Sequence, residues 1–277
     1  MIQKPPPILL VDRFPELLAT LLKMLDGLSL EEWERPTAAA GWNVHDIAIH
    51  LLGDDVGILS SARDNFRDVL VSFTTWDELV GWLNERNSLW VKATRRISPR
   101  LLCDLLKFTG DQVNTYFASL DPFVLGGPVS WAGPDPAPVW LDLAREFTER
   151  WHHQQHIRDA VNLPGLTEPR YLEPVLATFV HSLPQAYREV NAPESTSVTL
   201  TIAGNSRGSW SIVREQGRWQ LYVGKPTQPQ AEVVLPEDIA WRLFTKGIAS
   251  EVARGQAIFY GDQDLGWKML EAVSIIA

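Results

Sequence analysis

Three of the six histidines in this chain of 277 residues lie in one short stretch, together with a carboxylate. The stretch runs from Glu149 to His156 and also holds His152 and His153. If it is helical, at about 100° per residue, these four side chains fall within an arc of roughly 100°. Nitrogen and oxygen donors on one helix face are what a Zn²⁺-type or Ni²⁺-type site needs. The spacing predicts a metal site that faces another histidine, His50.

A solvated helix face is the alternative interpretation of the same stretch. The most continuous apolar stripe of this helix lies away from the histidine face. It consists of Leu143, Phe147 and Trp151, which lie some 120° to 200° around the helix from Glu149. A helix of a four-helix bundle can nevertheless show one face to the core and a flank to a cleft. Bundle metal sites are built from such facing helices.

His50 is predicted to lie in a helix that Asn43 caps, at the margin of its apolar stripe. Asp46 precedes it by one turn and Asp54 follows by one turn. It could be an ordinary boundary histidine bonded to either aspartate. If it instead faces Glu149 and His153, two nitrogens and one carboxylate would leave a coordination position open, as in catalytic sites. The aspartates would then orient the ring.

The elements that must position these residues are expected to be helices over the first two-thirds of the chain. Leucine spacing and Gly27 indicate a first helix, with Asp12 as its cap. Others are expected from Asn43 to about Asp68, from about Thr75 past Trp90, over 98–120, over 138–161, and over 171–190 with a break at Pro184. A Pro/Gly-rich crossover fills 121–136.

The sequence pattern changes after Pro193, where short segments begin that are rich in β-branched residues and alternate between apolar and polar side chains. They predict an antiparallel meander, then a helix that ends at Phe244, a short strand and a final helix. The segments expected as strands are 197–202, 208–213, 218–223, 231–235 and 257–260. The predicted domains are therefore an all-α domain over 1–192 and an α+β domain over 196–277.

Composition narrows the class of protein. The net charge is −9 and no basic block stands out, which argues against a nucleic-acid partner. No apolar run approaches the roughly 18 residues of a membrane helix, and the N-terminus has no signal-peptide core. The single cysteine, Cys103, excludes an internal disulfide and is expected in the core. A cytoplasmic protein is expected.

Two motifs resemble the DinB-like metal-binding bundles, most closely the mycothiol-dependent maleylpyruvate isomerase branch. The first is Trp42-x-x-x-Asp46-x-x-x-His50-Leu51, and the second is Glu149-x-x-x-His153-Gln-Gln-x-Ile157-Arg158. The C-terminal segments, with Gly261-Asp262, resemble the sterol-carrier-like domain that often follows this bundle. The resemblance implies a DinB-like four-helix bundle with accessory helices, followed by a small α+β sterol-carrier-like domain.

The resemblance also implies chemistry. A divalent metal, usually zinc, would be held by His50, Glu149 and His153, and a low-molecular-weight thiol such as mycothiol would be the cofactor. Metal binding lowers the pKa of a thiol and leaves a thiolate at neutral pH. The expected activity is an isomerase or S-transferase that acts on a small electrophile, in a monomer or homodimer. The catalytic and thiol-binding residues are not assigned.

His156 marks a departure, because the family commonly has an aspartate there; this histidine could be a fourth ligand. His152 is interpreted as a bystander, and His45 and His181 are assigned to structure. Two other functions stay open: a non-enzymatic protein with a metal site that binds a small molecule or lipid, and a metal-dependent hydrolase that uses water in place of the thiol.

Overall fold

A computed structural model describes residues 1–66 and 72–275. The chain forms two compact units. The helical unit consists of Leu10–Asp121 and Glu149–Gly165. The sheet unit consists of Met1–Leu9, Pro122–Thr148 and residues 166–275. The predicted domain boundary near Pro193 stays a prediction.

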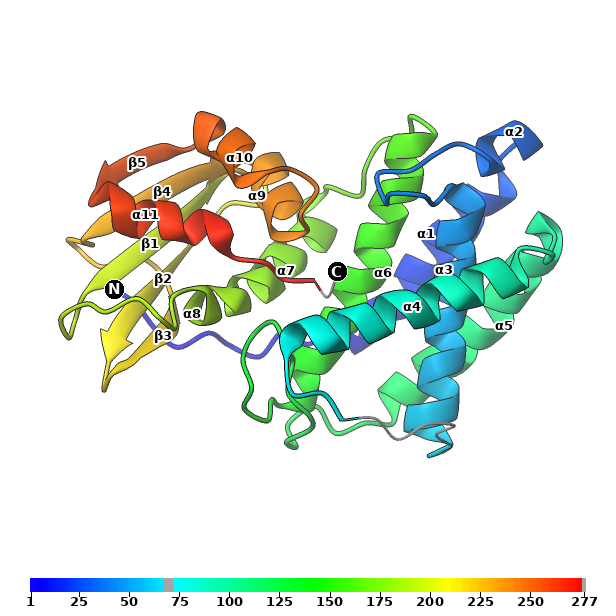
Figure 1. The fold of residues 1–277 in the computed structure, drawn as a ribbon, viewed down its shortest axis with the longest axis horizontal. Coiled ribbons are helices and arrows are strands. Elements are labelled where there is room, and N and C mark those ends of the chain that lie inside the picture. The colour runs from blue at the N-terminus through cyan, green and yellow to red at the C-terminus, as the bar shows by residue number, and fades with distance from the viewer. Residues whose placement is uncertain (67–71, 276–277) are drawn as a thin grey trace. The chain divides into compact units, whose positions relative to one another are not determined.

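The helical unit is a bundle of helices (Figure 1), several of which begin at capping residues. Asn43 and Asp46 form a capping box at α3, Thr75 and Glu78 form one at α4, and Ser98 caps α5. Helix α3 packs against α4 and α5, and α5 packs against α1. The elements are a 3₁₀ turn Val11–Arg13, α1 Phe14–Asp26, α2 Leu30–Trp33, α3 Val44–Gly57, a π-helix Ile58–Arg63, α4 Trp76–Thr94, α5 Pro99–Ala118 and the later part of α6 Val139–Ala160.

Some helix ends differ from the prediction. Asp12 does not cap α1, because it lies in the preceding 3₁₀ turn and the N-cap residue is Arg13. The α-helix that starts after Asn43 ends at Gly57 and continues as a π-helix to Arg63. Its predicted end, Asp68, lies outside the described residues. The short helix α2, which has its own capping box at Ser29, was not among the predicted helices.

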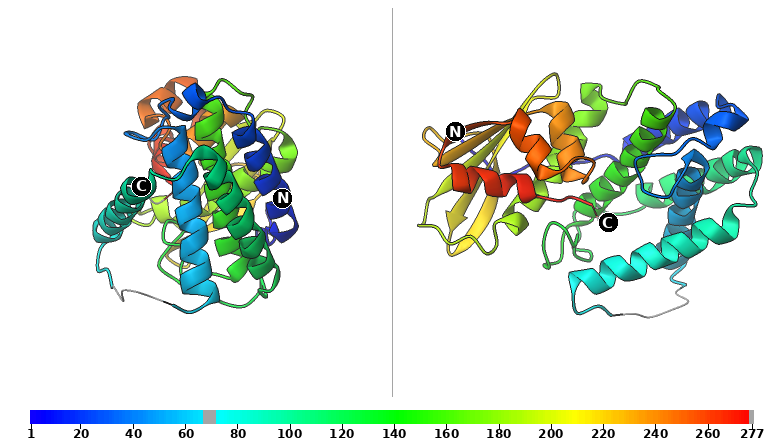
Figure 2. Two further views of the ribbon diagram at one scale, coloured as in Figure 1. Left: turned by 90° about the vertical axis from the view of Figure 1, so that its right-hand side faces the viewer. Right: turned by 45° about the horizontal axis from the view of Figure 1, so that its top comes forward.

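The sheet unit holds a five-stranded sheet in the order β3-β2-β1-β4-β5. Helices α9, α10 and α11 pack against β4, and α8 packs against β3; α11 lies along the sheet in Figure 2. The elements are α7 Pro169–Phe179, a 3₁₀ turn Val180–Ser182, α8 Leu183–Ala186, β1 Ser197–Ala203, β2 Gly208–Glu215, β3 Arg218–Val223, β4 Ala231–Pro236, α9 Glu237–Phe244, α10 Ser250–Gln256, β5 Ile258–Gly261, α11 Gln263–Lys268 and a 3₁₀ turn Met269–Glu271.

The predicted meander is wrong at its fourth strand. Strand β4 pairs in parallel with β1, with Val198 opposite Ala231, instead of antiparallel with β3. The connection over 224–230 contains Pro226 and Pro229 and crosses to the far side of β1, so it is not a hairpin. Alternation in a strand indicates which face is buried and not which strand is its neighbour. The helix break also precedes Pro184, which sits in the first turn of α8.

Among the described residues, none of the helices combines the length and the apolar character needed to cross a membrane.

Candidate metal centre

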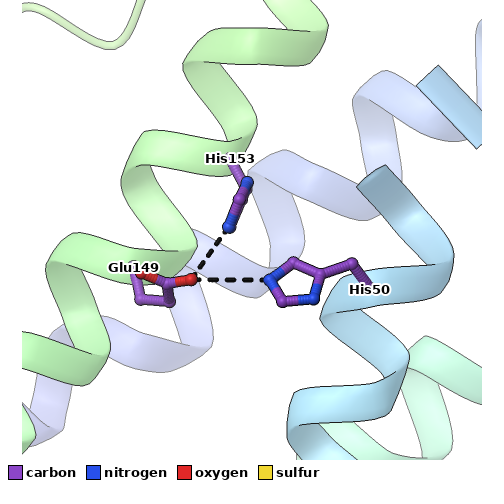
Figure 3. Close-up of side chains that lie close together, drawn as sticks. All are labelled: His50, Glu149 and His153. Atoms are coloured by element: carbon purple, nitrogen blue, oxygen red, sulfur yellow. Dashed lines mark hydrogen bonds and ion pairs between the residues drawn. The ribbon is translucent and has the colours of Figure 1, made fainter. Parts of the chain in front are cut away.

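Two helices of the helical unit bring His50, Glu149 and His153 together. His50 lies on α3, and Glu149 and His153 lie one turn apart on α6 (Figure 3). The Oε1 atom of Glu149 is 2.8 Å from Nε2 of His153 and 3.5 Å from Nε2 of His50. One ligand atom from each of the three residues lies within 4.8 Å of the other two. The set offers two imidazole nitrogens and one carboxylate oxygen, which suits a Zn²⁺-type ion with an open position.

Burial and charge oppose one another in this cluster. Burial alone would raise the pKa of Glu149, but the charges of and hydrogen bonds from His153 and His50 hold it well below its usual range. Burial alone would lower the pKa of His50, but Asp54 and Glu149 outweigh it and raise this pKa to about 9. At neutral pH Glu149 is therefore a carboxylate, which is the form that binds a metal, whereas His50 carries a proton that a bound metal would displace.

The two aspartates beside His50 have different partners. Asp54 Oδ2 lies 3.4 Å from His50 Nε2, which is the same nitrogen that faces Glu149, so Asp54 lies beside the donor atom and not behind the ring. Asp46 is buried at the start of α3, where it completes the capping box and accepts two hydrogen bonds from Arg95, at 2.8 and 2.7 Å. The structure therefore pairs Asp46 with the helix terminus and with Arg95. The Trp42 ring also packs against His50, with 5.1 Å between centroids.

The other predicted residues lie nearby or elsewhere. His152 and His156 pack together on α6 with ring centroids 4.2 Å apart, and the His156 ring is 5.4 Å from that of His153. A ligand role for His156 stays a prediction. His45 Nε2 bonds to the carbonyl of Ile97 at 2.8 Å, in keeping with a structural role. Cys103 is half-buried against the core of the bundle, and burial raises the pKa of its thiol.

A buried charged network beside the centre was not foreseen from the sequence. Arg150, next to Glu149 in the chain, donates to Asp55 Oδ1 at 2.8 Å, and Thr109 donates to Asp55 Oδ2 at 2.7 Å. Asp55 is only 4% exposed. The sequence gives only a weak signal for this network, because Asp55 interrupts the apolar stripe of α3. An acidic residue at such a position is usually exposed, and only its partners on α5 and α6 explain why it is buried.

Comparisons with known proteins give a family and a similar fold. The family model described as the mycothiol maleylpyruvate isomerase N-terminal domain matches residues 14–158. A solved structure of the mycothiol-dependent maleylpyruvate isomerase is similar in fold, with a TM-score of 0.50 and 13% identity over 84% of this chain and 86% of that one. A histidine-to-alanine mutant of that isomerase covers the same shares at 13% identity, with a TM-score of 0.49. A search of curated proteins gives no match.

The family model spans more than half of the sequence, from the first residue of α1 to within two residues of the end of α6. The matched residues include His50, Glu149 and His153, which form the candidate metal centre. This chain belongs to the mycothiol maleylpyruvate isomerase N-terminal domain family, a family of enzymes.

Proposed function

We propose that this protein is a metal-dependent isomerase or S-transferase that uses a low-molecular-weight thiol, mycothiol in the first instance, on a small electrophilic substrate. The observation that carries the proposal is the convergence of three donor atoms from α3 and α6. Family membership supports the thiol, because the family is that of a mycothiol-dependent isomerase. Zinc is the proposed metal, since nitrogen and carboxylate donors in a three-residue set suit it.

The residues of the chain have separable roles in this proposal. His50, Glu149 and His153 would hold the metal. The carboxylate charges of Glu149 and of the nearby Asp54 would offset part of the metal charge, and Trp42 would pack against the ring of His50. When bound, the metal and the thiol would together supply a thiolate, whose reversible addition to a conjugated double bond allows rotation about that bond. The same thiolate could displace a leaving group, which gives the S-transferase form of the proposal.

Metal content tests the ligand assignment. Purified wild-type protein is expected to bind one zinc ion, and His50→Ala and His153→Ala are expected to lose it. His45→Gln is the matched control, since that histidine bonds to a backbone carbonyl and belongs to no donor set among the described residues. Full zinc retention in either His50→Ala or His153→Ala would contradict the assignment. His156→Ala tests the fourth position in the same experiment.

Thiol dependence tests the activity. Zinc-loaded protein is incubated with mycothiol and a panel of cis-configured conjugated diacids and alkylating electrophiles. Cis–trans conversion without net thiol consumption indicates an isomerase, and stoichiometric thiol consumption indicates an S-transferase. Turnover of an ester or amide panel without thiol would instead support a hydrolase and overturn the thiol proposal.

A further inference from the structure

The sheet unit contains a cavity of about 420 Å³ that shares no residue with the metal centre. Its volume lies in the range of small-molecule sites, roughly 300–1,000 Å³. Its walls come from the segment before and at the start of α6, from α8, from β3 and from the N-terminal segment. Most of the lining side chains are apolar: Val129, Pro138, Leu141, Pro184, Trp219 and Leu221.

Trp219 forms a fixed flat wall of this cavity. Its indole nitrogen donates to the carbonyl of Val190 at 3.1 Å, and its ring meets that of Tyr187 edge-on, with centroids 5.2 Å apart. The side chain is 5% exposed. A tryptophan held at both its polar and its apolar edges offers a rigid face against which a flat, unsaturated ligand can pack.

His181 gives the cavity a polar group. Its Nε2 is buried and has no hydrogen-bond partner within residues 1–66 and 72–275. Burial lowers the pKa of this histidine to about 4, so the ring is neutral at pH 7. Its ring packs edge-on against Trp140, with centroids 5.6 Å apart, which fixes its orientation. A buried polar atom that lacks a partner is destabilising, and a hydrogen bond from a ligand would offset that cost.

Lys4 places a positive charge on the same cavity. The N-terminal segment is held along β3 by two backbone hydrogen bonds between Gln3 and Val223. The ammonium of Lys4 donates to Gln220 Oε1 at 3.2 Å and lies 4.2 Å from the centroid of the Tyr222 ring. The acid on the lining, Asp135, lies 3.9 Å from Arg218, which offsets its charge. The charged groups therefore favour an anion.

We propose that this cavity is a second ligand site, which binds a small, flat organic acid. The unsaturated body of the ligand packs against Trp219, Pro184 and Leu221, its carboxylate pairs with Lys4, and a hydroxyl or carbonyl substituent bonds to the neutral ring of His181. An apolar enclosure with a few convergent polar groups is the general form of a small-molecule site. The proposal does not depend on the candidate metal centre, and a measurement of ligand binding is enough to test it.

Titration calorimetry of the full chain with benzoate, 4-hydroxybenzoate and neutral benzyl alcohol tests the proposal at pH 7.5. We expect both acids to bind more tightly than the alcohol, and the hydroxylated acid more tightly than benzoate. Ala132→Phe places a ring in the cavity from its partly exposed loop and is expected to weaken the binding of both acids at least tenfold. Ala40→Phe, in an exposed loop of the helical unit, is the matched control and should bind as the wild type does.

Two further variants separate the polar contacts. Lys4→Gln is expected to weaken both acids roughly two- to fivefold and to leave the alcohol unchanged, as for an exposed ion pair; Lys23→Gln is its control. His181→Phe should remove the advantage of 4-hydroxybenzoate over benzoate. Absence of binding by either acid at about 10 mM overturns the proposal, as does unchanged affinity in Ala132→Phe or in Lys4→Gln.

Discussion

Glu149 places one oxygen atom within 2.8 Å of Nε2 of His153 and within 3.5 Å of Nε2 of His50, and its negative charge helps to raise the pKa of His50. The short distances from Oε1 to both Nε2 atoms put a carboxylate where it can bridge α6 to α3. Among the three residues of the candidate metal centre, Glu149 is the one that contacts both of the others. Replacing it by its neutral amide isolates that contribution, because the shape of the side chain is kept.

Glu149→Gln is expected to weaken zinc binding by more than about 100-fold, because loss of a residue that only supports a ligand already costs about 10- to 100-fold. A competition titration with a chromogenic chelator measures the affinity. Glu168→Gln, at an exposed position, serves as the control. Unchanged affinity in Glu149→Gln would remove this carboxylate from the ligand set.

His181 makes a prediction about pH. Its pKa is lowered to about 4 in the folded protein and lies near 6.5 in an unfolded chain, so the unfolded state takes up the proton first. The free energy of unfolding therefore does not depend on this histidine above pH 6.5. It decreases by about 2–3 kcal/mol as the pH falls from 6.5 toward 4, because the unfolded chain is protonated first. Urea unfolding of wild type and His181→Gln between pH 7 and pH 4.5 measures it. The variant should lose less stability; parallel pH profiles would contradict this account.

The sequence predicts the residues whose chemistry is local, and it misses those whose partners are remote. His50, Glu149 and His153 could be proposed because helical spacing and the two motifs place them. Asp46 and Arg150 could not be assigned. Asp46 bonds to Arg95, 49 residues away, and Arg150 bonds to Asp55, 95 residues away. Only the packing of the helices brings those partners together.

Two aspartates of helix α3 flank His50 and have different partners. Asp46 serves the helix start and Arg95, whereas Asp54 lies against the ring of His50. Asp46→Ala is expected to lower the free energy of unfolding by about 1–2 kcal/mol with little effect on zinc affinity. Asp54→Asn is expected to weaken zinc binding about tenfold with little effect on stability. Urea unfolding and chelator competition on both variants test the division, and a reversed pattern would refute it.

Two glycines on α3 test how closely the helices pack. A Cβ atom at Gly53 would lie 2.6 Å from Nε1 of Trp90, whose indole donates to the carbonyl of Ile49. Gly53→Ala should therefore destabilise the protein by about 1–3 kcal/mol. Gly57, one turn later, has no heavy atom within 4 Å of such a Cβ among the described residues, and Gly57→Ala should stabilise by about 0.5–1 kcal/mol. If chemical denaturation gave the same change in the free energy of unfolding for both variants, the contact between residue 53 and Trp90 would not be tightly packed.

The sequence predicts where helices start, but it does not predict which strands pair with one another. Asn43, Thr75 and Ser98 each mark a helix start that the structure confirms. The antiparallel pairing expected for β4 failed, because residues 224–230 carry no signal that says which strand comes next. A π-helix after Gly57 was equally invisible, since its sequence has the same periodicity as the α-helix it extends.

Metal binding should be visible in the stability of the whole chain. If zinc binds only the folded protein, free zinc at 100 times the dissociation constant adds about 2.7 kcal/mol to the free energy of unfolding. Thermal unfolding with and without zinc measures the shift, and the shift should disappear in His50→Ala. A shift of equal size in that variant would mean that zinc stabilises the protein elsewhere.

The two compact units are interleaved along the chain, and this has a consequence for synthesis. The helical unit needs 149–165, which leave the ribosome only after 122–148 of the sheet unit. The sheet unit needs Met1–Leu9, which are translated before the helical unit and whose partner strand β3 ends at Val223. The helical unit can be completed once residue 165 has emerged, but the sheet unit cannot. Residues 1–9 and 122–148 must therefore wait for their partners during translation, which makes the sheet unit the part of this protein that we expect to need chaperones during synthesis.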